Sequence, residues 1–140
     1  MGVYSGSIRL RTEGFSDIHD ITSDLTRILE ESDLRQGILV VALRGSTGGI
    51  TTIEFEPGVL KDFSELLDRL APQSKPYHHD SAWGDGNGYA HLRSSLIGTS
   101  FTVPFQEGKL LLGTWQQVVF IDFDNRPRER TLNVQLVGEG

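Results

Sequence analysis

Residues 57–70 read PGVLKDFSELLDRL and form the clearest helical pattern in the chain. Apolar residues recur at the spacing of one helix face, at Val59, Leu60, Phe63, Leu66, Leu67 and Leu70. Pro57 suits the first position of a helix, where the backbone amide needs no partner, and Pro72 prevents continuation. The segment therefore predicts a helix over residues 57–70 with its apolar side chains on one face.

Strand patterns precede this helix. Residues 37–43, GILVVAL, form a continuous apolar run and predict a central strand covered on both faces. Residues 50–55 are rich in β-branched side chains, and residues 4–11 alternate apolar and polar positions, so both segments predict strands. Between the strand segments 4–11 and 37–43, an expected helix carries Leu25, Ile28 and Leu29 on one face.

After residue 72 the periodicity is lost until Asn87, which suits the N-cap of a short helix that ends at Gly98. Residues 101–106, 110–122 and 130–137 then predict three strands in an antiparallel meander. Helices among early strands and an antiparallel group at the end favour one α+β domain over residues 1–140. We expect a sandwich of mostly antiparallel strands with two to three helices.

Composition excludes several classes of function. The chain has no cysteine, which removes disulfides, thiolate metal ligands and a cysteine nucleophile. The formal net charge is −6 and the basic residues are scattered, so a nucleic-acid surface is not expected. No apolar run approaches the roughly 18 residues of a membrane span, and we expect a cytoplasmic protein with no membrane partner.

The polar side chains concentrate in one segment, residues 77–88, which reads YHHDSAWGDGNG. In a helix that starts at Asn87, His91 lies one turn further on and faces back toward this segment, where it could meet His79. Two imidazoles, an oxygen donor and water suit Zn²⁺ or a related divalent ion. His79 and His91 are therefore the candidate metal ligands.

Each of these residues also has a structural interpretation. His79 fits an exposed loop position, and His91 fits a hydrogen-bonded core position. Asp80 and Asp85 could bind metal or act as a base, or could bond only to nearby backbone. Glu54, in an apolar strand, is a catalytic candidate if buried and an ordinary surface residue if it faces solvent.

Substrate contacts are expected from other positions. Ser46 and Thr47 lie in a glycine-rich turn whose amides could hold a phosphate, although the turn lacks the lysine of a P-loop and also suits an ordinary turn. Trp83, in a glycine-rich loop, could stack on a heteroaromatic ring. Asn87 completes the set of candidate substrate-binding residues.

Five motifs in the chain resemble those of the YjbQ-type family, long listed as uncharacterised and often labelled secondary thiamine-phosphate synthase. They are residues 45–47 (GST), 52–58 (TIEFEPG), 77–80 (YHHD), 87–92 (NGYAHL) and 111–116 (LLGTWQ). The resemblance spans nearly the whole chain. It implies a sandwich-like α+β subunit that assembles as a homotrimer, with polar residues and a metal in a cleft near a subunit boundary.

Residue by residue, the family's Tyr-x-His-Asp pattern falls on Tyr77, His79 and Asp80. Its Asn-Gly-x-Ala-His-Leu pattern falls on residues 87–92. Many relatives have histidine where this chain has Gly45 and Tyr89, so a metal site here must rest on His79, His91 and oxygen donors or water.

The resemblance implies a thiamine-phosphate synthase that uses a divalent ion, Zn²⁺ or Mg²⁺, and a phosphorylated small-molecule substrate. The ion would offset the charge of pyrophosphate as it leaves. One alternative is a metal-dependent hydrolase or lyase for another metabolite, with Glu54 or Asp80 as base. Another is a non-catalytic trimeric module that only binds a ligand.

Overall fold

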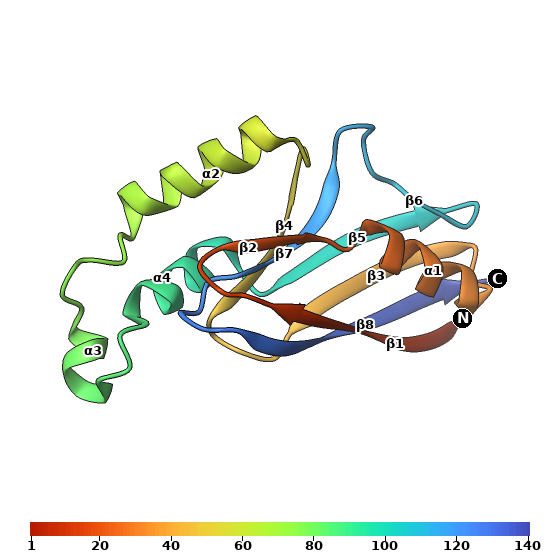
Figure 1. Cartoon of the computed structure of the whole chain (residues 1–140). Coiled ribbons are helices and arrows are strands. Elements are labelled where there is room, and N and C mark those ends of the chain that lie inside the picture. Colours follow the sequence, from red (N-terminus) through yellow and green to blue (C-terminus); the bar gives the residue numbers. More distant parts are fainter.

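The computed structural model describes all 140 residues and consists of two antiparallel sheets and four helices (Figure 1). The α+β class predicted from the sequence is confirmed. The strands are β1 (Gly2–Thr12), β2 (Asp17–Asp20), β3 (Gln36–Leu43), β4 (Gly48–Ile53), β5 (Ser100–Gln106), β6 (Lys109–Leu110), β7 (Gln117–Asp122) and β8 (Arg128–Glu139). The helices are α1 (Thr22–Ser32), α2 (Pro57–Leu70), α3 (His78–Trp83) and α4 (Gly88–Ile97).

The larger sheet has the strand order β1-β8-β3-β5-β6, and the smaller has β2-β7-β4. All strand pairs are antiparallel. Strands β1 and β8 pair along their whole length, from Gly2 opposite Gly138 to Thr12 opposite Arg128. The two termini therefore lie together at one end of the molecule (Figure 1).

The main core lies between the two sheets, with α1 closing one side through Leu25, Ile28 and Leu29. Strands of both sheets contribute to it. Their buried side chains are Ile8, Leu39, Val41, Leu43, Ile50, Val103, Phe105, Val118, Phe120, Leu132, Val134 and Leu136. Burial of this apolar area is the main favourable term for the fold.

A second core lies on the other face of the smaller sheet. Val119, Ile121 and Phe123 point away from the main core and pack with residues of α2 and α4, among them Leu67 and Ala90. Strand β7 is thus buried on both faces, and the helices form a third layer. This layer holds α4, and with it α3, at the end of the molecule away from the termini (Figure 1).

Two strand predictions were wrong in detail. Strand β3 is central, between β8 and β5, but only alternate residues such as Leu39 and Val41 are buried, and Ile38 is exposed. The strand covered on both faces is β7 instead. The expected meander is absent, because residues 111–116 separate β6 from β7 and place these strands in different sheets.

The helix expected over residues 57–70 is α2, with the same limits. The short α3 lies in the segment that carried no periodic pattern, and α4 follows Asn87 as expected. Asn87 occupies the N-cap position of α4, as expected, but its side chain makes no capping hydrogen bond. No helix in the structure combines the length and the apolar character needed to cross a membrane.

Candidate functional site

The junction of α3 and α4 folds the polar segment back on itself. Gly84 and Gly86 adopt positive φ angles of 72° and 70°, a conformation that side-chain-bearing residues rarely take. At Gly88 a Cβ would lie 2.7 Å from the Cβ of Tyr77, so only glycine permits this close approach. The Gly88 amide donates to Oδ1 of Asp80 at 2.9 Å, which ties the start of α4 to the first turn of α3.

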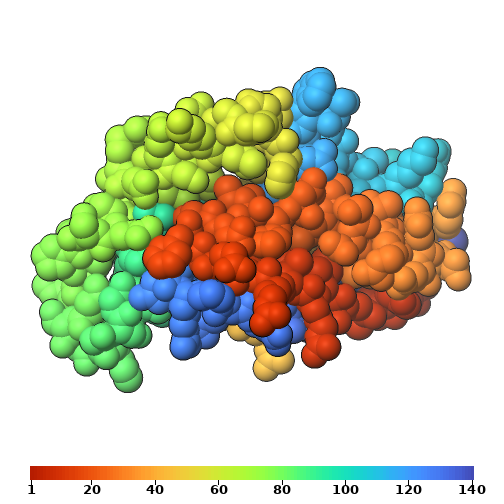
Figure 2. Space-filling view, viewed as in Figure 1, coloured from red at the N-terminus to blue at the C-terminus, as the bar shows by residue number.

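This folding brings the two candidate histidines together. The rings of His79 on α3 and His91 on α4 have centroids 4.4 Å apart, with their planes tilted by 38°. His78, which precedes His79, is exposed. The site lies where α3 meets α4, and α3 is the green segment at one edge of the space-filling view (Figure 2).

Carboxylates surround His79. Its Nδ1 lies 3.3 Å from Oδ1 of Asp80 and 3.4 Å from Oδ1 of Asp85. One ligand atom from each of the three residues lies within 4.8 Å of the others, and His91 does not belong to this group. The donor set thus includes Asp85, which the sequence left ambiguous between metal binding and local bonding.

These distances fit a shared cation. The contact with Asp80 is a long hydrogen bond and the contact with Asp85 is an ion pair, and both distances exceed the roughly 2.7–3.2 Å typical of N–H···O bonds. Ligand atoms arranged tetrahedrally at Zn–N and Zn–O lengths of about 2.0–2.1 Å lie about 3.3–3.4 Å apart. One imidazole and two carboxylates, open to solvent on one side, form a donor set of the kind used by catalytic zinc.

Asn87 lies beside this donor set, with its side chain bonded to the protein interior. Its Nδ2 donates to Oδ1 of Asp124 at 3.2 Å. The amide Oδ1 of Asn87 is buried and has no hydrogen-bond partner within the chain. Buried polar atoms are almost always paired, so this oxygen is an exception within the site.

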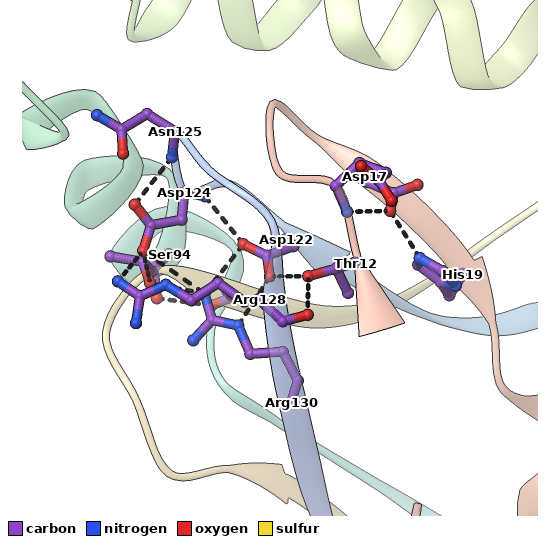
Figure 3. Close-up of polar contacts among 12 residues, drawn as sticks. Thr12, Asp17, His19, Ser94, Asp122, Asp124, Asn125, Arg128 and Arg130 are labelled. Atoms are coloured by element: carbon purple, nitrogen blue, oxygen red, sulfur yellow. Dashed lines mark hydrogen bonds and ion pairs between the residues drawn. The ribbon is translucent and has the colours of Figure 1, made fainter. Parts of the chain in front are cut away.

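Behind Asn87 lies a buried network of charged groups (Figure 3). Asp122 and Asp124 are completely buried. Arg130 donates to both oxygens of Asp122, at 2.7 and 2.9 Å, and Arg128 pairs with Asp124 at 2.7 Å. Two carboxylates and two guanidinium groups balance the charge, which makes their removal from water tolerable.

Hydrogen bonds set the pKa values of this network. Burial alone raises the pKa of Asp122, but bonds from Arg130, from Thr12 and from the Asp124 amide outweigh it and hold the pKa below its usual value. For Asp124, burial also raises the pKa, and donors that include the Asn125 amide and Asn87 lower it below the usual value. Both groups are therefore stable anions in the fold.

Thr47 belongs to the same network. Its hydroxyl donates to Oδ2 of Asp124 at 3.2 Å and accepts from Arg130 at 2.8 Å. These bonds occupy the hydroxyl of Thr47, which was a candidate substrate-binding residue, whereas the neighbouring Ser46 is exposed. Within the turn, only Ser46 keeps a side chain free for a ligand.

Trp83 and Glu54 lie at opposite ends of the chain segment that contains α2 and α3. Trp83 ends α3 and is 77% exposed, close in the chain to Asp85. Glu54 is exposed at the other end of α2, a helix about 21 Å long at 1.5 Å per residue (Figure 1). There it lines a groove of about 550 Å³ with Trp115, so the chain itself does not bring Glu54 to His79.

Sequence reasoning did not assign the roles of Asp122, Asp124, Arg128 and Arg130. An Asp-x-Asp pair at the end of an apolar strand, followed by an Arg-x-Arg pair at the start of the next, is the signal that could have revealed them. Buried carboxylates need such partners.

Comparison with known proteins gives one family. A family model described as UPF0047 protein YjbQ-like matches residues 6–139. A UPF0047 protein of Methanothermobacter thermautotrophicus is 39% identical over 139 residues, which cover 99% of this chain and 95% of that protein.

Solved structures agree with this match. A YbjQ-like protein of unknown function from Sulfolobus solfataricus P2 superposes with a TM-score of 0.94 at 30% identity, and the match covers 99% of both chains. A hypothetical protein from Aeropyrum pernix K1 gives 0.89 at 33% identity, with 96% of this chain and 98% of that one covered. These proteins share the fold of the present chain over its whole length.

Proposed function

The chain belongs to the UPF0047, YjbQ-like family, and from that premise we propose that it is a divalent-metal-dependent enzyme acting on a small phosphorylated molecule. The observation that carries the proposal is the donor set of His79, Asp80 and Asp85, with the Nδ1 atom 3.3 and 3.4 Å from the two carboxylate oxygens. No other group of three such residues in the structure is placed in this way.

An imidazole with two carboxylates favours Zn²⁺, whereas Mg²⁺ prefers oxygen ligands alone. A divalent ion held here would polarise a phosphoryl or carbonyl oxygen and neutralise the charge that develops on a leaving group. His91, in ring contact with His79, is the nearest further imidazole and could accept a proton from substrate or complete the ligand set.

One specific form of this function is the formation of thiamine phosphate, in which the ring nitrogen of a thiazole phosphate would bond to the methylene carbon of a hydroxymethylpyrimidine pyrophosphate as pyrophosphate leaves. The exposed indole of Trp83 supports it, because an exposed aromatic face near the donor set could stack on a pyrimidine ring. Ser46, which is exposed, is the candidate contact for the rest of the substrate, and Asn87, also expected to bind substrate, is buried.

The second candidate is hydrolysis or elimination on another small metabolite. Asp80 favours it, since its carboxylate lies beside His79 and is already oriented by the Gly88 amide. A carboxylate in that position could accept a proton from water. If the protein shows no turnover, the same site would belong to a binding module without catalysis.

We also propose that the protein works as a homotrimer in the cytoplasm. Leu92 and Leu96 are exposed and lie one turn apart on α4, directly after His91. An apolar face on a helix favours burial against a partner surface. A second copy seated on this face would bring a subunit boundary next to the proposed metal site.

Metal binding is tested on purified, chelator-treated protein by equilibrium dialysis against Zn²⁺, Mn²⁺ and Mg²⁺. The expected result is one Zn²⁺ per chain, with little binding by His79→Ala or Asp85→Asn. Zinc retained in full by the His79→Ala and Asp85→Asn double variant would remove the assignment.

The metal-loaded protein is then assayed for thiamine phosphate from a pyrimidine pyrophosphate and a thiazole phosphate. Release of free phosphate or pyrophosphate from each single substrate serves as the parallel assay. Product in the first assay identifies the transferase, and product only in the second identifies a hydrolase. Metal binding without turnover in either assay would point to the binding module.

A further inference from the structure

Two consecutive residues after β7, Asp124 and Asn125, hold the loop that carries Asp85. We infer that Asn125 is a positioning residue for the proposed metal site, and that Asp124, held by Thr47 and Arg128, is the support to which this loop is attached. The inference rests on the proposed function, because it assigns a purpose to the placement of Asp85. Neither residue touches the donor atoms themselves.

The first attachment is a side-chain hydrogen bond. Nδ2 of Asn125 donates to the backbone carbonyl of Asp85 at 2.9 Å. The two residues are far apart in the sequence, so only the tertiary fold brings them together. Because this bond fixes the peptide unit of Asp85 itself, it restricts where the carboxylate can lie relative to His79.

The second attachment lies two residues further along the loop. The carboxylate of Asp124 accepts from Nδ2 of Asn87 at 3.2 Å and from the backbone amide of Asn125 at 2.8 Å. Asp124 therefore holds both Asn87 and the residue that binds Asp85. The flexible Gly86 lies between the two attachments, with its φ of 70°.

Asp124, which supports these attachments, is itself held by several bonds. Asp124 is fully buried and is bonded at its other oxygen to Thr47 and Arg128, while its backbone amide donates to Asp122. Buried charge clusters of this kind contribute little net stability compared with an apolar core of the same size. Their advantage is a defined geometry, which an exposed glycine-rich loop lacks.

The attachment also explains how an exposed loop residue could act as a metal ligand. A carboxylate on a freely moving loop would lose conformational freedom on binding an ion, and that cost would lower affinity. Because the Asn125 bond holds the backbone of Asp85, much of this conformational entropy is lost already during folding. Groups that orient ligands in this way typically change metal affinity by about 10–100-fold.

The test compares Asn125→Ala with Thr12→Val. Asn125→Ala removes the bond to Asp85 and keeps every bond of Asp124. Thr12→Val removes a donor to Asp122 at 2.6 Å and touches no residue of the loop. Zn²⁺ affinity, the absorption spectrum of the Co²⁺-substituted protein and hydrogen exchange over residues 84–88 without metal are measured for both.

We expect Asn125→Ala to bind Zn²⁺ about 10–100-fold more weakly, to alter the Co²⁺ spectrum and to exchange faster over residues 84–88. Thr12→Val should lower the melting temperature and leave affinity, spectrum and loop exchange as in the unmodified protein. Unchanged affinity in Asn125→Ala, with Zn²⁺ bound normally by the unmodified protein, overturns the positioning role and leaves the metal site intact. Failure of the unmodified protein to bind any divalent ion removes the proposed function, and this inference with it.

Discussion

The imidazole rings of His79 and His91 lie in contact, with centroids 4.4 Å apart, although they belong to different helices. The two carboxylates next to His79 lie at its Nδ1 atom, while His91 stands outside the group of donor atoms that converge. The histidines therefore differ in their expected importance for a bound ion.

Replacing each histidine of the segment separately tests this difference. His79→Ala should abolish Zn²⁺ binding, because it removes the one nitrogen shared by the donor set. His91→Ala should weaken binding by about 10-fold or less if the residue only supports the site. His78→Ala is the matched control and should bind normally, since this neighbour is exposed. Equal, complete loss in His79→Ala and His91→Ala would make both residues ligands.

Acid should destabilise the protein through the buried carboxylates. The pKa values of Asp122 and Asp124 are lower in the fold than in the unfolded chain. Their contribution to stability is therefore fully present above the ordinary aspartate pKa of about 3.9 and is lost as the pH falls through the lower folded values. Urea unfolding at pH 7, 4 and 3 should show the free energy of unfolding decreasing in acid.

Asp122→Asn should lower that free energy by about 3 kcal/mol at pH 7, because Arg130 would lose its buried counter-charge. Its acid dependence should also be shallower than that of the unmodified protein. Asp62→Asn, at an exposed position, is the control and should change neither quantity. An equal acid slope in Asp122→Asn and the unmodified protein would contradict the assignment.

Two adjacent leucines of α2 should respond differently to truncation. Leu67 is 1% exposed and packs in the second core, whereas Leu66 is 41% exposed. Leu67→Ala should cost about 2–5 kcal/mol through lost burial and a new cavity, and Leu66→Ala less than about 1 kcal/mol. Chemical denaturation of both variants measures the difference, and similar values would mean that α2 packs through another face.

The first turn of α2 depends on Glu56. Its carboxylate accepts hydrogen bonds from the amides of Gly58 and Val59, as an N-cap residue does. Glu56→Ala should lower the free energy of unfolding by about 0.5–2 kcal/mol. Glu54→Ala, two residues earlier and exposed, should leave it within about 0.5 kcal/mol. Thermal unfolding followed by circular dichroism compares the two, and equal losses would exclude the capping role.

The proposed trimer makes a separate prediction. Sedimentation velocity should give three times the mass of one chain, and Leu96→Glu should shift the protein toward monomers because it places a charge on the exposed apolar face of α4. Thr26→Glu adds the same charge at an exposed position of α1, a different helix, and should leave the assembly intact. A monomeric unmodified protein would contradict the proposal directly.

The family resemblance read from the motifs is confirmed by the match over residues 6–139. Local patterns were sufficient for α2, because helical periodicity and flanking prolines act within a few residues. They were insufficient for β3 and β7. Whether an apolar strand is covered on one face or both depends on which sheet and helices lie against it, and that information is spread over the whole chain.

The same division holds for the candidate site. The sequence by itself placed the candidate site in residues 77–91, since these histidines, aspartates and glycines are all local to that segment. Only the tertiary structure decided that Asp85 joins His79 and Asp80, and that Asn125 and Asp124 hold the loop in place. The contacts of Asn125 and Asp124 with the loop join residues 40 and 37 positions apart in the chain. Such pairs form only when packing of the two cores sets the distance between β7 and α4.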